Sequence, residues 1–143
     1  MKRIFPKEEV CIGCRLCEVH CLVEHSASKD VIKAYTRETP RPLPRLRVQM
    51  KGTTSFPVPC RHCSEPLCVY SCLTGALSQD PATGVVTVDK KKCKRCWTCI
   101  LACPYGAIWR DTESIVKCDF CPGRDVPACV ANCPNEALVL AEA

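Results

Sequence analysis

The feature that most constrains this chain is its cysteine content, because sixteen of its 143 residues are cysteine. Only eight residues are aromatic (three Phe, two Trp and three Tyr), so an ordinary apolar core would be thin. Small chains of this kind usually need disulfides, metals or partners to offset the conformational entropy lost on folding. Groups bonded through cysteine are therefore expected to replace much of the core. The cysteines form four groups of four, numbered here one to four along the chain: Cys11, Cys14, Cys17 and Cys21; Cys60, Cys63, Cys68 and Cys72; Cys93, Cys96, Cys99 and Cys103; Cys118, Cys121, Cys129 and Cys133.

The spacing within the groups is typical of iron–sulfur proteins. Group three and Pro104 form the run Cys-x2-Cys-x2-Cys-x3-Cys-Pro, in which the fourth cysteine usually binds the other cluster of a pair. Group one has the same spacing but continues with Leu22, whereas groups two and four have a wider second gap. This pattern predicts [4Fe-4S] clusters bound by cysteine thiolates.

The last two cysteines of every group are four residues apart, which suits a short helix. On a helix they would lie on one face, about 5.4 Å apart along the axis, so that one thiolate reaches its own cluster and the next reaches a neighbour. Pro66 and Pro127 stand two residues before the third cysteine of their groups, where proline can begin a helix without losing a needed N–H. The wider gaps are therefore predicted to be loops that lead into the same kind of helix.

Zinc is the main alternative metal, since four cysteines also make a structural zinc site. Zinc ribbons normally separate two cysteine pairs, whereas groups one and three place three cysteines within seven residues and add a fourth at helical spacing. This crowding favours a cuboidal cluster. Disulfides are disfavoured because the chain shows neither a signal peptide nor an apolar run long enough to cross a membrane, which predicts a reducing, cytoplasmic location.

An internal repeat follows three of the groups, in the words Thr74–Leu77, Tyr105–Ile108 and Asn135–Leu138. Between groups two and three, residues 80–89 combine a turn with a β-prone stretch, which predicts a small antiparallel hairpin. Residues 60–110 would thus form an inner unit with two clusters. Groups one and four would then form an outer unit from residues 1–59 and 111–143, although sequential pairing of one with two and of three with four stays open.

Residues 22–59 contain no cysteine and are rich in proline and in basic residues. They are expected to be a partly extended linker that crosses between the units, with a strand at Leu46–Met50. A docking surface for a partner is the alternative, because residues 37–51 of the segment carry five cations: Arg37, Arg41, Arg45, Arg47 and Lys51.

The net charge of +5 does not indicate nucleic-acid binding. Each oxidised cluster with four thiolates carries a charge of about 2−, so the protein with four clusters has a net charge of about −3. No aromatic platform or basic stripe fits a known mode of nucleic-acid recognition. Protein partners are therefore expected.

Several basic residues adjoin the cysteines and could either be solvated or raise cluster potentials by stabilising the reduced state: Arg15, Arg61, Lys94, Arg95 and Arg124. His20, His25 and His62 also lie near cysteine groups, but hydrogen bonding is expected of them rather than iron ligation, because the cysteines already suffice. The sequence has no Ser/His/Asp set, no phosphate loop and no nicotinamide or flavin fingerprint, so no catalytic residues are assigned.

The whole chain resembles the four-cluster, ferredoxin-like electron-transfer subunits of bacterial and archaeal oxidoreductases. Relatives of this type accompany carbon monoxide dehydrogenase, aldehyde oxidoreductase, formate dehydrogenase, hydrogenase and dimethyl sulfoxide reductase. The sequence motifs that carry the resemblance are Cys11–Cys17, Cys60–Cys63, Cys93–Gly106 and Lys117–Arg124. The chain lacks the long insertions and C-terminal extension of many membrane-complex relatives, which favours soluble partners.

The resemblance implies four [4Fe-4S] clusters in a nested arrangement. The four ligand sets would be Cys11, Cys14, Cys17 with Cys133; Cys118, Cys121, Cys129 with Cys21; Cys60, Cys63, Cys68 with Cys103; and Cys93, Cys96, Cys99 with Cys72.

We therefore expect an α+β, ferredoxin-like fold with two pseudo-symmetric units of short helices and small antiparallel hairpins. Single electrons would pass through the clusters between a catalytic oxidoreductase subunit, with tungsten, molybdenum or nickel, and a second redox protein. The alternatives are a freely diffusing multi-cluster ferredoxin, a structural cluster module and a zinc-bound module. Self-association into longer assemblies is also open.

Overall fold

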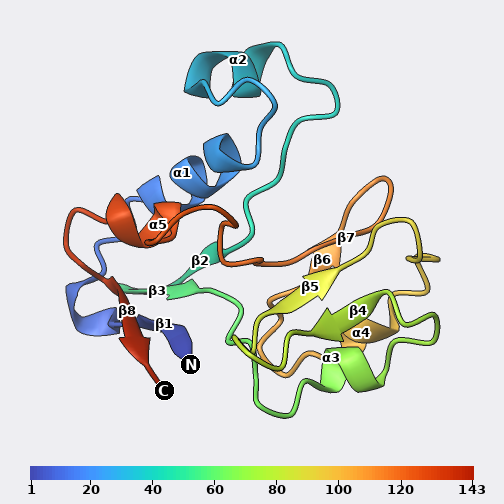
Figure 1. The fold of residues 1–143 in the computed structure, drawn as a ribbon. Helices are drawn as coiled ribbons and strands as arrows, with labels where there is room; N and C mark the ends of the chain where they lie inside the picture. The colour runs from blue at the N-terminus through green and yellow to red at the C-terminus, as the bar shows by residue number, and fades with distance from the viewer.

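The computed structural model describes all 143 residues as a small α+β protein built from short elements (Figure 1). Its eight strands pair only as antiparallel two-stranded sheets, and none of its helices is long and apolar enough to cross a membrane. The elements in chain order are β1 (Lys2–Pro6), η1 (Glu8–Val10), α1 (Leu16–Glu24), α2 (Val31–Thr36), β2 (Arg47–Lys51), β3 (Thr54–Val58), α3 (Leu67–Tyr70), β4 (Leu77–Gln79), β5 (Val86–Val88), α4 (Thr98–Ala102), β6 (Trp109–Arg110), β7 (Ile115–Val116), α5 (Ala128–Ala131) and β8 (Leu138–Glu142).

The two ends of the chain lie side by side, because β1 pairs with β8 (Figure 1). In this register Ile4 stands opposite Leu140, and the N–H of Ala143 donates to the carbonyl of Met1 at 2.9 Å. Helix α1 packs against α5 beside this sheet. The sheet thus joins the segments that carry cysteine groups one and four.

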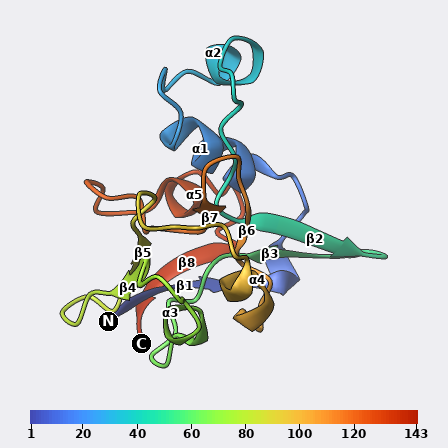
Figure 2. The same ribbon diagram turned by 90° about the vertical axis from the view of Figure 1, so that its right-hand side faces the viewer.

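Cysteine groups two and three lie in the other half of the molecule, where α3 packs against α4 and β4 pairs with β5 (Figure 2). The turn between these strands is closed by the N–H of Gly84, which donates to the carbonyl of Asp80 at 2.7 Å. Gly84 has φ +70°, a conformation that glycine adopts at little cost. The hairpin predicted at residues 80–89 is therefore confirmed, with its strands extending on both sides of the turn.

Residues 22–59 are more structured than the expected linker. The predicted strand at Leu46–Met50 is observed one residue later as β2, and it forms a hairpin with β3 through a turn at Gly52. The segment also contains α2, whose first turn is capped by the Asp30 carboxylate accepting from the N–H of Lys33.

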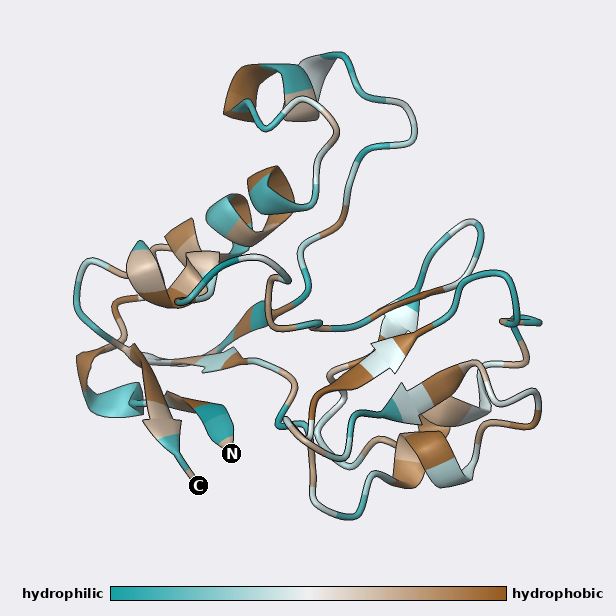
Figure 3. Cartoon of the chain, viewed as in Figure 1, coloured by the Kyte–Doolittle hydropathy of each residue, from teal (hydrophilic) through white to brown (hydrophobic).

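The apolar core is small and divided, as the composition predicted. Hydrophobic residues are scattered over short elements of both halves rather than collected on one broad face (Figure 3). The larger cluster joins Ile4, Leu46, Val48 and Leu138 to five buried cysteines, and the smaller one contains Leu77, Val86, Ile108 and Ile115 with Cys99. Thiols therefore take up much of the space that apolar side chains fill in an ordinary domain.

Candidate iron–sulfur sites

The loop at the start of every cysteine group has the same backbone feature. The residue before the second cysteine is left-handed in all four groups, at Gly13, His62, Arg95 and Phe120, with φ between +45° and +69°. A left-handed residue turns the chain sharply, so that successive N–H groups can point to one side and form a concavity that attracts an anion. The four loops are thus alike in conformation although their sequences differ.

The repeated words after groups two, three and four also share a conformation. Their second residues, Gly75, Gly106 and Glu136, all have positive φ. In the word that follows group four, the N–H of Ala137 donates to the sulfur of Cys133 at 3.2 Å. The internal repeat seen in the sequence is therefore a repeated turn that wraps the last cysteine of its group.

A short helix was predicted to carry the last two cysteines of each group, and the structure shows a helix at the third cysteine of every group. Both Cys17 and Cys21 lie within α1, whereas the last cysteine of the other groups lies at or just beyond the end of its helix. Pro66 and Pro127 stand at the N-caps of α3 and α5, which confirms their predicted role at the helix starts.

Three hollows are each lined by four cysteines from two different groups. The largest is a cavity of about 280 Å³ with Cys60, Cys63, Cys68 and Cys103 in its wall; a second is lined by Cys11, Cys14, Cys17 and Cys133, and a third by Cys72, Cys93, Cys96 and Cys99. We call these the inner central, outer terminal and inner terminal sets. The remaining four cysteines are all buried and form the outer central set: Cys21, Cys118, Cys121 and Cys129.

Neighbouring sets meet through pairs of thiols. Burial raises the pKa of Cys129. The pKa is raised further by the charges of Cys21 and Cys121, from its own set, and by that of Cys17, from the outer terminal set. Burial and then the charge of Cys60 raise the pKa of Cys118.

The inner sets meet in the same way. Burial raises the pKa of Cys99 to about 11, and the charge of Cys68 from the neighbouring set adds to this effect. Packing agrees, since Cys17, Cys129, Cys118 and Cys60 share the larger apolar cluster and Cys68 packs against the smaller one with Cys99. These contacts connect the sets in the order outer terminal, outer central, inner central and inner terminal.

The environment of the thiols suits a metal cluster. Burial raises the pKa values of Cys17 and Cys21 to about 12, because a thiolate without a countercharge is poorly solvated there. Bound iron would supply that countercharge, with the thiol proton released. Donors are already aimed at sulfur, since the backbone N–H of Arg45 donates to Cys21 at 3.1 Å. The residues present therefore fit [4Fe-4S] clusters.

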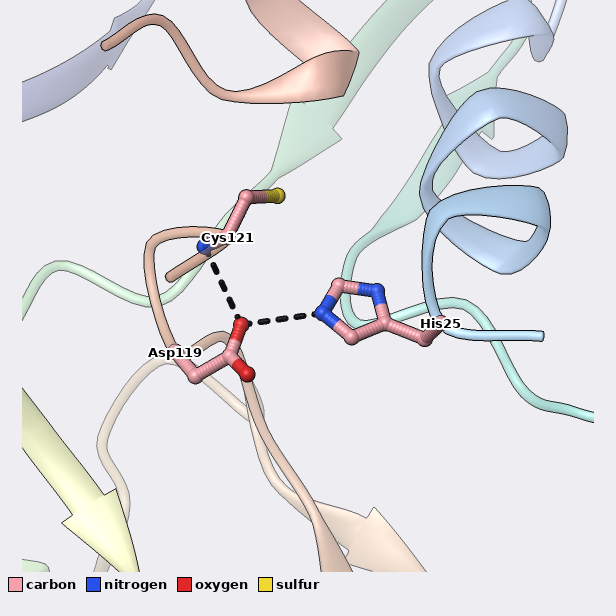
Figure 4. A group of neighbouring side chains, drawn as sticks. All are labelled: His25, Asp119 and Cys121. Atoms are coloured by element: carbon pink, nitrogen blue, oxygen red, sulfur yellow. Dashed lines mark hydrogen bonds and ion pairs between the residues drawn. The ribbon is translucent and has the colours of Figure 1, made fainter. Parts of the chain in front are cut away.

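A network centred on Asp119 lies beside Cys121 of the outer central set; Figure 4 shows its contacts with His25 and with the backbone N–H of Cys121. The Asp119 carboxylate contacts Arg45 at 2.6 Å and His25 at 3.0 Å, and it accepts from the N–H of Cys121 at 3.1 Å. Burial alone would raise the pKa of Asp119, but the hydrogen bond from His25 and the charge of Arg45 outweigh it and hold the pKa below its usual range. The network fixes the loop between Cys118 and Cys121 against α1.

The three histidines differ in their surroundings. His25 belongs to the network just described, and His62 is buried and accepts from the N–H of Val86 at its Nδ1. Burial lowers the pKa of His62 to about 3, so its imidazole is neutral at pH 7. Hydrogen bonding was predicted for all three histidines; it is confirmed for His25 and His62. The prediction is wrong for His20, whose side chain makes no hydrogen bond within the chain.

The basic residues singled out in the sequence lie at the surface. Arg15 pairs with Glu18, Arg124 pairs with Glu24, and Arg61 stacks on Tyr105; Lys94 and Arg95 are exposed. Two buried cations, Arg3 and Lys117, were not singled out in the sequence. Arg45, which was considered as part of a docking surface, is instead half-buried in an ion pair with Asp119. Lys117 directly precedes Cys118, but the sequence contains no signal that this lysine, unlike the other ligand-flanking cations, is buried.

The fold and the grouped thiols define an iron–sulfur protein of the ferredoxin type. A family model described as a 4Fe-4S dicluster domain matches residues 52–143, which include cysteine groups two, three and four. The chain belongs to this family.

Curated relatives extend the similarity over group one. The electron transport protein HydN of Escherichia coli K12 is 39% identical over 147 residues, covering 90% of this chain and 81% of the relative. An iron-sulfur protein of Rhodospirillum rubrum is 33% identical and covers 94% and 79%. A tetrathionate reductase subunit of Salmonella typhimurium LT2 is 33% identical over 92% of this chain and 54% of the relative.

A solved structure also matches nearly the whole chain. It is the active site complex BamBC of benzoyl coenzyme A reductase as isolated, with 25% sequence identity and a TM-score of 0.54 over 99% of this chain and 76% of the matched chain.

Proposed function

We propose that this protein is a non-catalytic electron-transfer subunit that carries four [4Fe-4S] clusters, one on each of the four cysteine sets. The observation that carries the proposal is the agreement between three hollows and three of the nested ligand sets implied by the sequence resemblance. The names of the relatives support electron transfer, since HydN is an electron transport protein.

The order of the sets suits a linear relay. Cys14 and Cys96 are the exposed cysteines, and they belong to the two terminal sets at opposite ends of the row. The outer central set is wholly buried between them. Electrons would therefore enter near one exposed terminal set and leave near the other.

The clusters supply one-electron redox chemistry, and the protein determines how easily each accepts an electron. The buried thiols of the outer central set keep water from it. N–H groups such as those of Arg45 and Ala137 stabilise negative charge on sulfur. Lys94, Arg95 and Lys90–Lys92 are exposed around the inner terminal set, which would favour an acidic partner there.

The proposed division into two units follows the cysteine pairing, with one change to its boundary. The predicted boundary at residue 110 falls inside the β6–β7 hairpin, where Arg110 pairs with Ile115. Ile115 packs with Leu77 and Val86 in the inner cluster. The inner unit is therefore better placed at residues 60–116, and the outer unit at 1–59 with 117–143.

The partners proposed are a catalytic oxidoreductase subunit, containing tungsten, molybdenum or nickel, and a second redox protein. Two comparisons support an assembly of this type: one relative is a subunit of tetrathionate reductase, and the matched structure belongs to the BamBC active site complex.

Anaerobic preparation of the protein tests the cofactor proposal. We expect about sixteen irons and sixteen sulfides per chain, the content of four [4Fe-4S] clusters. We also expect mutually coupled paramagnetic signals on reduction. About eight irons, zinc in place of iron, or clusters that no reductant reduces would contradict the proposed relay.

Native anaerobic purification from the source cells tests the proposed partners. Recovery in a stoichiometric complex with a tungsten, molybdenum or nickel subunit is the expected result. Recovery of the iron-loaded chain alone would favour the freely diffusing ferredoxin, for which the exposure of both terminal sets is the supporting observation.

A further inference from the structure

Lys117 is a buried lysine at the junction of the two units. Its side chain is only 1% exposed, and its Nζ donates to the carbonyl of Val86 at 2.6 Å and to the carbonyl of Cys118 at 2.8 Å. Val86 lies on β5 in the inner unit, whereas Cys118 belongs to the outer central set. The ammonium group therefore lies between the halves of the proposed relay.

No carboxylate compensates the charge of Lys117. Among the ion pairs of the chain none involves this lysine, and the neighbouring Asp119 is already engaged by Arg45 and His25. A lysine is almost never fully buried unless it is paired, because an uncompensated charge is strongly unfavourable away from water. Two carbonyl oxygens satisfy hydrogen bonds, but they carry no net charge.

The groups that face Lys117 belong to the two central sets. Cys118 and Cys60 meet at this junction. Burial raises the pKa of Cys68, and the nearby charge of Lys117 is the largest effect that lowers it. His62 is also close, but an imidazole supplies no negative charge. The only negative charge available to the buried ammonium is therefore that of the central thiolates and what they bind.

We propose that Lys117 is a positioning residue that supplies the buried positive charge compensating the two central clusters. The proposal rests on the proposed function, since it requires a cluster on each central set. Reduction adds one electron, and hence one negative charge, to a cluster, and burial makes this addition harder. A fixed positive charge between the two clusters offsets this effect and raises their reduction potentials.

The test compares variants of the cluster-loaded protein. Lys117→Arg keeps the charge, Lys117→Gln keeps a donor without the charge, and Lys117→Met removes both. Lys33→Gln, an exposed position on α2, is the matched control for the loss of one positive charge. Iron is counted per chain, and the four one-electron steps are followed by anaerobic redox titration with electron paramagnetic resonance.

Removal of the charge is expected to affect two of the four steps. In the Gln and Met variants the ratio of reduced to oxidised cluster at a given solution potential should fall about tenfold for two clusters, which equals about 59 mV for one electron. The other two steps, and all four in the Arg variant and in Lys33→Gln, should change less than about twofold. Loss of about eight irons from both neutral variants but not from the Arg variant would support the same role.

Two results would overturn the proposal. The first is a full iron content with four unchanged steps in the Gln and Met variants. The second is an Arg variant that fails in the same way as the neutral ones, because the geometry of the lysine rather than its charge would then matter. Fewer than about sixteen irons in the unsubstituted protein would instead contradict the proposed function.

Discussion

The proposed outer and inner units differ in how far they bury their cysteines. Five of the eight cysteines in the outer unit are buried, but only Cys60 and Cys99 are buried in the inner unit. The additional cover comes from residues 22–59, since Leu46 and Val48 pack with Cys17 and Cys21. The backbone N–H of Arg45 also reaches the sulfur of Cys21.

The difference indicates what a longer connection contributes to a cysteine-rich fold. The β4–β5 and β6–β7 hairpins of the inner unit have strands of two or three residues, whereas the β2–β3 hairpin and the β1–β8 sheet of the outer unit have strands of five. A more enclosed cluster is less accessible to oxygen and chelators, and its potential depends more strongly on internal charges. The two units are therefore expected to differ in lability as well as in potential.

Complete removal of iron should have the largest effect. Since thiols form much of both apolar clusters, the metal-free chain should lose most of its far-ultraviolet circular dichroism. Under an anaerobic chelator, about half of the iron should leave faster, from the inner unit, before the fold is lost. A native-like spectrum without iron would contradict the view that clusters replace the core.

Single cysteine substitutions should separate buried from exposed ligands. Cys129→Ala, in the buried outer central set, should remove about four irons and make the remaining clusters labile. Cys96→Ser, at an exposed position, should keep close to the full iron content, because serine oxygen can replace the thiolate at the surface. Iron analysis and the rate of absorbance loss in air measure both effects. Equal losses of iron from the two variants would contradict the expected difference between buried and exposed ligands.

Two leucine truncations compare the apolar cover of the units. Leu46 is 2% exposed in the larger apolar cluster, and Leu77 is 3% exposed in the smaller one. Each Leu→Ala change should cost about 2–5 kcal/mol. Anaerobic unfolding in guanidinium should show that Leu46→Ala accelerates bleaching of the outer clusters and Leu77→Ala that of the inner ones. Identical bleaching patterns would show that the units unfold together.

The Asp119 network should give the outer unit a dependence on pH. Because the pKa of Asp119 is held below its usual 3.8, its contribution is fully present above that value and is lost as the pH falls through the lowered pKa. Asp119→Asn should therefore destabilise the protein by about 1–3 kcal/mol at pH 7. Anaerobic bleaching rates at several pH values measure this, and the two proteins should converge only below about pH 4. A constant difference in acid would assign the effect to other groups.

The ion pair between Arg124 and Glu24 should matter least. Their side chains are 40% and 24% exposed, so water screens most of the attraction. Arg124→Gln should change the free energy of unfolding by less than about 1 kcal/mol and should lose even this effect in high salt. A larger change, measured by anaerobic denaturation, would show that the loop after Cys121 depends on this contact.

Local sequence spacing was sufficient to predict the cysteine loops, the short helices and the β4–β5 hairpin. These features depend on a few adjacent residues, such as a proline at a helix start or a glycine in a turn, whose preferences act over one turn of chain. The repeat after three of the groups was visible for the same reason, and its members Gly75, Gly106 and Glu136 share one backbone conformation.

The cover of the outer unit and the buried cations required the tertiary structure. Arg45 reaches Asp119, and Lys117 reaches Val86, across long separations in sequence. Nothing in the residues around Lys117 distinguishes it from Lys94, which is also beside a cysteine but exposed. Cysteine spacing is a local property that the sequence alone determined, whereas burial of a charge depends on segments that meet only after folding.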